Sequence, residues 1–189
     1  MSVRLETERL LLREPEDGDV PALLLYYQFN EDRFARWEPE RLGGLAEFQH
    51  WVRWRRTESE AGRGRSFLAF DRTAPDALVA VVNLYDIRTL AIHMAILGYS
   101  LDGAYEGRGV AREAVEAVIA YAFGTLNLHR LEANYQPANE RSGALLRRLG
   151  FVVEGYARDM IFLRGTWRDH IRTSLTNPSW KRPETTAPA

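Results

Sequence analysis

The segment Tyr105-Glu106-Gly107-Arg108-Gly109-Val110-Ala111 decides the fold, because it joins a predicted strand to a predicted helix. The apolar run Ala91–Leu101 before it predicts a strand, and apolar side chains after it recur at helical spacing as far as Ala122. The first N–H groups of a helix have no intrahelical acceptor and lie at the positive end of the helix dipole. The two glycines let an anion approach those groups, and the arginine between them adds positive charge. The segment therefore predicts a phosphate-binding loop.

Several kinds of phosphate-binding loop compete for this pattern. A Walker loop requires GxxxxGK[ST], and no lysine lies nearby. A dinucleotide-binding fingerprint requires a third glycine where the chain has Arg112, although Glu132 follows at a spacing that suits a ribose-binding acid. Coenzyme A is the ligand that fits the remaining features best. The structural alternative is a glycine turn that binds nothing.

The rest of the chain alternates predicted strands and helices. We expect an α/β (α+β) domain over residues 1–180, with a mixed, twisted central sheet of about six or seven strands and helices on both faces. A loose tail rich in Pro and Thr is expected over residues 181–189. The predicted strands are Arg9–Arg13, Ser66–Phe70, Leu78–Tyr85, Ala91–Leu101, Arg130–Gln136, Phe151–Leu163 and Asp169–Leu175, and the predicted helices are Val20–Phe29, Leu45–Ala61, one from Val110, and one capped by Asn139.

Composition excludes several classes of protein. The net charge of −1 gives no global basic field, so no nucleic-acid partner is expected. The chain has no cysteine, which removes disulfides, thiol catalysis and cysteine-ligated metals, and its four histidines form no HExxH motif, so no metal site is expected. No apolar stretch is long enough to span a membrane, and the N-terminus lacks the apolar core of a signal peptide. We therefore expect a cytoplasmic protein with no membrane partner.

Short motifs surround the loop on both sides. They are Gly98-Tyr99-Ser100, Asn134-Tyr135-x-Pro137-x-Asn139-x-x-Ser142, Leu149-Gly150-Phe151 and Glu154-Gly155. With the loop, they resemble the GCN5-related N-acetyltransferase (GNAT) superfamily. Trp37-Glu38-Pro39 and Trp167-Arg168-Asp169-His170 make the chain similar, within that superfamily, to the RimJ-like ribosomal-protein alanine N-terminal acetyltransferases. The resemblance covers essentially residues 5 to 180.

The resemblance implies a GNAT fold that binds acetyl-CoA between two splayed strands. These would be the strand before the loop and the strand Arg130–Gln136. One position departs from the family, because Ala104 stands where Gln or Arg is frequent. Binding would then depend on backbone amides and on Arg108. The implied cofactor-binding residues are Leu97, Gly98, Tyr99, Gly107, Arg108, Gly109, Val110, Ala111, Asn134 and Asn139.

The resemblance also implies direct transfer of the acetyl group, in a ternary complex, to the α-amine of a protein N-terminus. Such an amine has a pKa of about 7.7–8.0, so little help from a general base is needed. Ile96 stands where many family members have Glu, so no carboxylate carries over. Ser142 is the candidate proton donor for the leaving thiolate, and helix capping is its structural alternative. His93, predicted on the same strand and side as Leu97, is the candidate base, with core packing as the alternative.

The acceptor of the acetyl group is less well defined by the sequence. By resemblance it is the N-terminus of a ribosomal protein of the S5 type, with Trp37, Glu38 and Tyr135 as substrate-binding candidates. A small amine such as an aminoglycoside or a polyamine is an alternative acceptor. A CoA-binding module without catalysis is another alternative. Glu154 is a further carboxylate that a surface salt bridge explains equally well, and the chain is expected to be a monomer or a homodimer.

Overall fold

Eight strands form one sheet in the computed structural model, which describes residues 3–40 and 44–183. Along the chain they are β1 (Arg4–Glu6), β2 (Leu10–Arg13), β3 (Arg65–Asp71), β4 (Ala74–Arg88), β5 (Met94–Leu101), β6 (Arg130–Tyr135), β7 (Val152–Leu163) and β8 (Thr166–Thr176). Their order across the sheet is β1-β2-β3-β4-β5-β6-β8-β7. Strands β5 and β6 pair in parallel, whereas the other neighbours are antiparallel.

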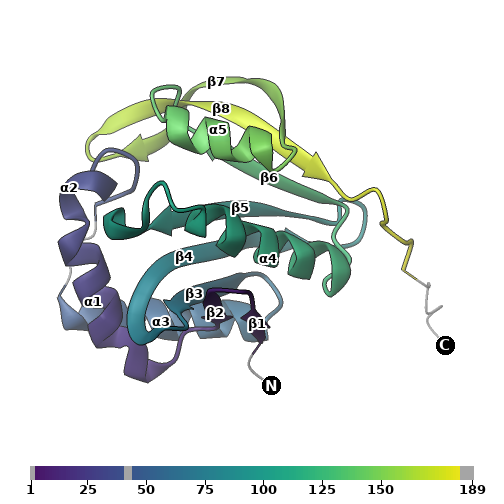
Figure 1. The fold of residues 1–189 in the computed structure, drawn as a ribbon. Helices are drawn as coiled ribbons and strands as arrows, with labels where there is room; N and C mark the ends of the chain where they lie inside the picture. Colours follow the sequence, from purple (N-terminus) through teal and green to yellow (C-terminus); the bar gives the residue numbers. More distant parts are fainter. Residues whose placement is uncertain (1–2, 41–43, 184–189) are drawn as a thin grey trace.

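Helices cover both faces of this sheet. They are α1 (Val20–Phe29), α2 (Glu31–Phe34), α3 (Leu45–Glu60), α4 (Val110–Gly124) and α5 (Glu140–Arg148). Helices α1 and α3 pack on one face, and α4 and α5 lie over the other, with α4 across β4 and β5 and α5 across β6 (Figure 1). The predicted mixed α/β fold is confirmed.

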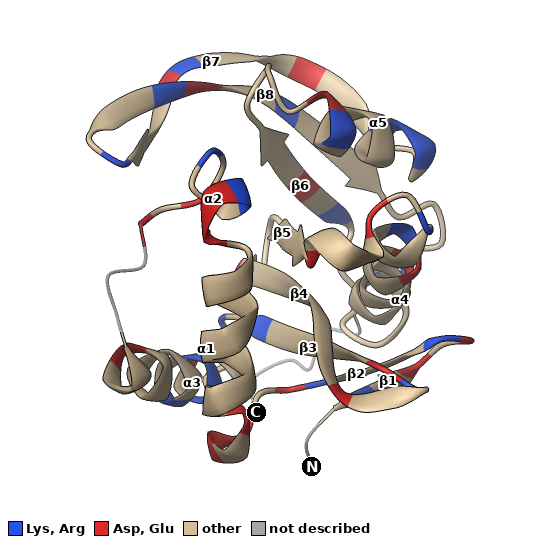
Figure 2. Cartoon of the chain, turned by 60° about the vertical axis from the view of Figure 1, so that its left-hand side comes forward, with Lys and Arg blue, Asp and Glu red and all other residues tan. Residues whose placement is uncertain are grey.

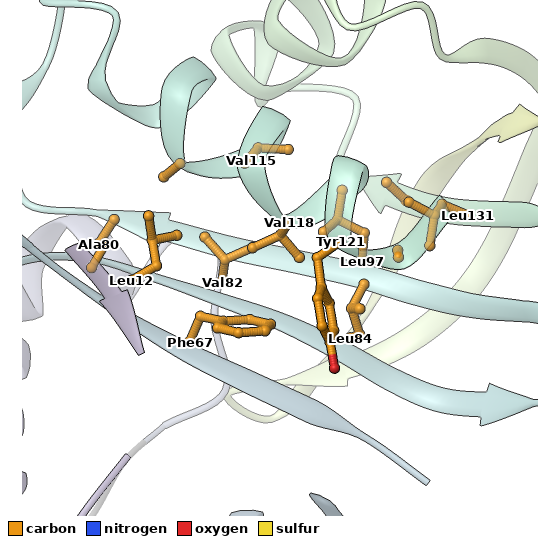
Figure 3. Packing of buried hydrophobic residues seen from close by; sticks show 14 of the residues in the cluster. Leu12, Phe67, Ala80, Val82, Leu84, Leu97, Val115, Val118, Tyr121 and Leu131 are labelled. Carbon is orange, nitrogen blue, oxygen red and sulfur yellow. The ribbon is translucent and has the colours of Figure 1, made fainter. Parts of the chain in front are cut away.

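Alternation along the central strands supplies both faces with apolar side chains. On β3, Phe67 points into the core beneath α4, while Leu68, the next residue, points into the core beneath α1 and α3. Figure 3 shows Phe67 facing Tyr121 of α4, and their ring centroids lie 5.4 Å apart. Each such fully buried side chain contributes about 1.5–3 kcal/mol of stability. The core beneath α4 fixes this helix, and with it the loop that precedes α4.

The sheet has one strand more than expected, because β1 was not predicted. In this strand a single apolar residue, Leu5, stands between two charged ones, so the sequence shows no run of alternation. The strand is held by pairing with β2, in the register Arg4↔Arg13. This pairing depends on backbone groups, which the side-chain pattern does not reveal.

The predicted strand Ala91–Leu101 is wrong at its beginning, because β5 starts only at Met94. Leu90 and His93 have φ angles of 64° and 48°. These angles lie in the left-handed region, outside the range of regular extended backbone. The stretch before Met94 is therefore a turn between β4 and β5.

The end of the described chain is attached to the domain. Lys181, predicted to begin a loose tail, donates its backbone N–H to the side chain of Asn127 and accepts a hydrogen bond from it. Residues 184–189 of the predicted tail lie outside the described residues. Within residues 3–40 and 44–183, no helix combines the length and the apolar character needed to cross a membrane.

Candidate active site

Strands β5 and β6 separate partway along their length. Their last paired residues are Ile96 and Glu132, yet β5 continues to Leu101 and β6 to Tyr135. Beyond this point β6 stays paired with β8, and β5 stays paired with β4. The edge of β5 after Ile96 is therefore unpaired on the β6 side, and it can accept an extended chain as an added strand. We call the space between the ends of these two strands the gap; Figure 1 shows β5 and β6 diverging there.

The glycine loop lies at the end of β5 and leads into α4. Gly107 and Gly109 have φ angles of 71° and 76°, in the left-handed region that other residues adopt at a cost of about 1–2 kcal/mol. Within the described chain, the backbone N–H groups of residues 107–111 donate to no protein acceptor. A row of free N–H groups at the start of a long helix is suited to bind a phosphate.

Arg9 fixes the loop from outside the gap. Its guanidinium donates to the carbonyl of Arg108 at 2.7 Å and forms a salt bridge with Glu113 at 2.6 Å. The guanidinium of Arg108 lies 5.7 Å from the ring centroid of Tyr105 and lines a cavity of about 250 Å³ with Arg9 and Asp71. This cavity lies beside β2 and β3, so the side chain of Arg108 is on that side of the loop. Its predicted cofactor contact can come from its backbone N–H.

Gly98 and Tyr99 occupy the unpaired part of β5. A side chain at Gly98 would bring its Cβ within 2.8 Å of the ring of Tyr85, so packing alone explains this glycine. The hydroxyl of Tyr99 hydrogen-bonds to the hydroxyl of Ser142 at 2.8 Å. Burial raises the pKa of Tyr99 to about 12, although the Ser142 hydrogen bond opposes the shift. Tyr99 is therefore protonated at neutral pH and joins β5 to α5 across the gap.

Ser142 lies in the first turn of α5, as predicted. The side chain of Asn139 accepts a hydrogen bond from the Ser142 backbone N–H at 3.2 Å, so Asn139 caps this helix. The Ser142 hydroxyl remains available for the bond to Tyr99. The capping role thus belongs to Asn139, and Ser142 presents its hydroxyl toward β5.

Asn134 and Tyr135 lie on opposite faces of β6. Tyr135 is buried in the core, where its ring packs so closely that a Cβ at Gly143 would lie 2.7 Å from it. This position beneath α5 does not support the predicted contact of Tyr135 with an acceptor. Asn134 points to the other face, and its side-chain oxygen is buried without a hydrogen-bond partner. Such an oxygen can accept a hydrogen bond from a bound ligand.

His93 was expected on the strand, on the same side as Leu97, and that placement is wrong. It precedes β5, at the end where β5 and β6 are still paired, and its carbonyl accepts hydrogen bonds from the backbone of His129 and Arg130. Its ring lies 5.3 Å from that of Trp180. The predicted catalytic role of His93 therefore has no support from its position.

The region predicted to bind the acceptor follows α2. The backbone N–H groups of Trp37 and Glu38 donate to the carbonyl of Phe34 at 2.9 and 2.8 Å, forming a tight turn. Tyr26 of α1 donates to the hydroxyl of Ser100 on β5 at 3.0 Å. Burial raises the pKa of Tyr26 well above its ordinary value, and the charge of Glu38 raises it further. The charge of Glu38 thus acts on Tyr26, which is bonded to Ser100 near the end of β5.

Asn30 attaches the start of α2 to the end of β5. Its side-chain oxygen accepts from the backbone N–H of Gly103 at 2.9 Å, and its amide nitrogen donates to the carbonyl of Tyr26 at 2.9 Å. Sequence reasoning did not single out Asn30 or Tyr26. Asn30 had one signal, since a polar residue following an apolar helix favours a cap or a turn.

Glu106, the residue before Gly107, was also missed. Its carboxylate accepts hydrogen bonds from Arg33 of α2 and from Arg141 of α5, and these bonds, that of Arg33 above all, hold its pKa below the usual value. It links elements that are far apart in the sequence. Glu154, by contrast, forms a salt bridge with Arg130 whose hydrogen bond lowers its pKa to about 2, and the salt-bridge interpretation of Glu154 is confirmed.

Known proteins share this architecture. The acetyltransferase (GNAT) domain model matches residues 9–152. The [ribosomal protein uS5]-alanine N-acetyltransferase of Escherichia coli (strain K12) is 38% identical over 180 residues, which are 94% of this chain and 93% of that protein. The structure of a ribosomal-protein-S5-alanine acetyltransferase from Vibrio fischeri has a TM-score of 0.89 and 32% identity, covering 95% of this chain and 100% of the other. Mycobacterium smegmatis RimJ, solved in complex with CoA-disulfide, has the same fold, with a TM-score of 0.82, 24% identity, and coverage of 93% and 86%.

Proposed function

The chain belongs to the GNAT acetyltransferase family, and on that premise we propose that it transfers the acetyl group of acetyl-CoA to the α-amine of a protein N-terminus. The acceptor we propose is a ribosomal protein of the S5 type, and we propose that the reaction takes place in the cytoplasm. The observation that carries the donor assignment is the gap between β5 and β6, with the free N–H groups of the loop at its end. The acceptor assignment rests on the 38% identity to the uS5-alanine N-acetyltransferase over 94% of the chain.

The residues around the gap fit acetyl-CoA in hydrogen-bonding capacity. The unpaired edge of β5 from Leu97 onward offers backbone groups to the amides of the pantetheine arm. The loop N–H groups offer donors to the diphosphate. The unpartnered side-chain oxygen of Asn134 offers an acceptor to an N–H group of a ligand in the gap. When bound, the thioester supplies the acetyl group.

The chemistry requires a neutral amine, a stabilised oxyanion and a proton for the sulfur. The amine nitrogen forms a bond to the acetyl carbon, the carbon–sulfur bond breaks, and the amine loses a proton as the thiolate gains one. Ser142 is the hydroxyl best situated to hold a proton for the thiolate, because it faces Tyr99 on β5. Tyr99 stays protonated and keeps the Ser142 hydroxyl directed across the gap. An α-amine of pKa about 7.7–8.0 is partly neutral at pH 7, so positioning can supply much of the rate.

The acceptor would approach from the side of α1 and α2. Glu38 gives this side a negative charge near Tyr26, which favours a cationic N-terminus over a neutral group. Because Asn30 attaches the start of α2 to Gly103, α2 is held in a fixed position relative to the end of β5. An amine and a thioester held in register gain from proximity alone.

Mass spectrometry of acetylated peptides tests the proposal. The purified chain is incubated with acetyl-CoA and a synthetic peptide carrying the N-terminal sequence of a ribosomal S5 protein, beginning with Ala. One acetyl group on the α-amine is expected. A matched peptide with a blocked N-terminus and a free Lys should remain unmodified. Acetylation of the Lys, or of spermidine in place of the peptide, would refute the assignment of the acceptor while preserving that of the donor.

A further inference from the structure

Arg141 lies across the gap from the glycine loop. It stands in the first turn of α5, and its guanidinium donates to the carboxylate of Glu106, the residue before Gly107. The same carboxylate also accepts from Arg33 of α2. Two guanidiniums therefore share one carboxylate, so Glu106 alone neutralises only one of them. The side chain of Arg141 is 81% exposed, so solvent or a ligand can reach it.

The loop lacks another side chain that could supply this charge inside the gap. Arg108 directs its guanidinium to the cavity beside β2 and β3. Ala104 has no polar side chain, and Arg112 forms a salt bridge with Glu116 at 2.8 Å. A diphosphate at the loop N–H groups carries two negative charges, which backbone dipoles neutralise only in part. Arg141 is the cation that Glu106 holds toward this position.

The neighbouring contacts fix the place of Arg141 relative to the gap. Ser142, the next residue, bonds to Tyr99 on β5, and Gly143 packs on Tyr135 of β6. The first turn of α5 is thereby attached to both strands that border the gap. Arg141 consequently faces the end of the gap, where the loop begins.

We propose that Arg141 binds the diphosphate of coenzyme A from the α5 side of the gap, and that Glu106 positions it for this role. This inference rests on the proposed function, because it takes coenzyme A as the donor. Arginine suits the task, since its planar guanidinium can give two parallel hydrogen bonds to phosphate oxygens. A surface salt bridge without function would contribute little, because exposed ion pairs add little to stability.

The test compares Arg141→Ala with Arg147→Ala, which removes an exposed arginine from the last turn of the same helix. Calorimetric titration of each variant with CoA and with 3′-dephospho-CoA gives two dissociation constants. We expect Arg141→Ala to weaken both about tenfold, the loss of one charge-assisted hydrogen bond. Arg147→Ala should bind both as the wild type does. Thermal unfolding of Arg141→Ala should match that of the wild type.

A truncated donor separates contact with the diphosphate from a general effect on α5. With S-acetylpantetheine, which has no diphosphate, the acetylation rate of Arg141→Ala should equal that of the wild type. An equal loss of rate with both donors would overturn the proposal. So would weakening confined to CoA, since that outcome assigns the contact to the 3′-phosphate. The titrations need no acceptor, so they test this inference separately from the proposed function. Unchanged CoA affinity in Arg141→Ala refutes this inference. Wild-type CoA binding without acetylation of the peptide refutes only the proposed function.

Discussion

Two hydroxyl groups, those of Tyr99 and Ser142, meet between β5 and α5. The Tyr99 phenol, with a pKa of about 12, cannot act as a base near neutrality. It can hold the Ser142 hydroxyl in one orientation at 2.8 Å. In the proposed mechanism, Ser142 would then donate to a developing thiolate without a change of rotamer. The proposed roles are therefore proton donation for Ser142 and orientation for Tyr99.

Replacing Ser142 with Ala should lower kcat by about a hundredfold to a thousandfold, the range for loss of a positioned donor. The KM for acetyl-CoA should change little, because the serine acts on the sulfur mainly as charge develops there. Steady-state kinetics with the N-terminal peptide provide the measurement. Ser179→Ala, at an exposed position near the end of the described chain, is the matched control and should retain wild-type kcat. A wild-type kcat for Ser142→Ala would leave this serine with a structural role only.

Replacing His93 with Ala should leave kcat unchanged. Its ring contacts Trp180, and it lies at the paired end of β5, away from the gap. Loss of that contact should lower the free energy of unfolding by about 1 kcal/mol. Chemical denaturation measures the stability and peptide acetylation measures kcat. A large drop in kcat with unchanged stability would contradict the position described here.

Single residues were predicted well where the local pattern determines their role. Asn139 was expected to cap a helix and does so. Ser142 and Tyr99 were each singled out, but their bond depends on how β5 and α5 meet in space. Of the adjacent pair, Asn134 was expected to contact the cofactor and Tyr135 the substrate, and the two side chains point to opposite faces of β6. The alternation of side chains along a strand already predicts that these two residues face opposite sides.

At the scale of the element, the glycine loop has a conformational requirement that can be measured. Gly109 has a φ of 76°, so alanine there is strained by about 1–2 kcal/mol. Since the loop N–H groups depend on this conformation, Gly109→Ala should weaken CoA binding about tenfold or more. Calorimetric titration with CoA provides the measurement.

Gly124, at the end of α4, provides the matched control for that substitution. An added Cβ there meets no atom within 4 Å, and helical alanine is favoured over glycine. Gly124→Ala should bind CoA as the wild type does and unfold at the same or a higher temperature. Equal loss of CoA affinity in both variants would mean that the loop conformation is not what binds the ligand.

Elements with a strong period were predicted closely. Helix α1 begins and ends at Val20 and Phe29, as expected, and α4 begins at Val110. The start of β5 was missed because the hydrophobic pattern does not reveal that Leu90 and His93 adopt left-handed φ angles. Hydrophobic periodicity reports which face is buried, and it does not report where a strand turns.

At the scale of the whole molecule, the site is assembled from segments that only the topology brings together. Glu106 joins α2 to α5 through Arg33 and Arg141, and Figure 2 shows charged residues of α2 and α5 on either side of the region where β5 ends. Contacts between residues 73 and 35 positions apart in sequence, as Glu106 makes with Arg33 and Arg141, leave no local pattern. The gap itself was expected from family resemblance, whereas this ionic link across it was not predicted.

The dependence of the rate on pH should report the acceptor and not an enzyme base. Since Ile96 replaces the family carboxylate and His93 lies away from the gap, kcat/KM for the peptide should rise tenfold per pH unit below about 7.7–8.0, the pKa of an α-amine. Above that range it should stay level to about pH 10, because Tyr99, with a pKa of about 12, remains protonated.

Stability should follow a different course at alkaline pH. The pKa of Tyr99 is raised in the folded state, so its contribution is complete below the unfolded value of about 10. That contribution is lost as pH rises from about 10 toward 12, and the buried Tyr26 adds a loss of the same sign. Peptide kinetics measured over a range of pH test the predicted rate profile. Thermal unfolding over the same range tests the loss of stability at alkaline pH. A second acidic limb in the kinetic profile that disappears in His93→Ala would place this imidazole in the mechanism and contradict the assignment of proton transfer to the amine and Ser142.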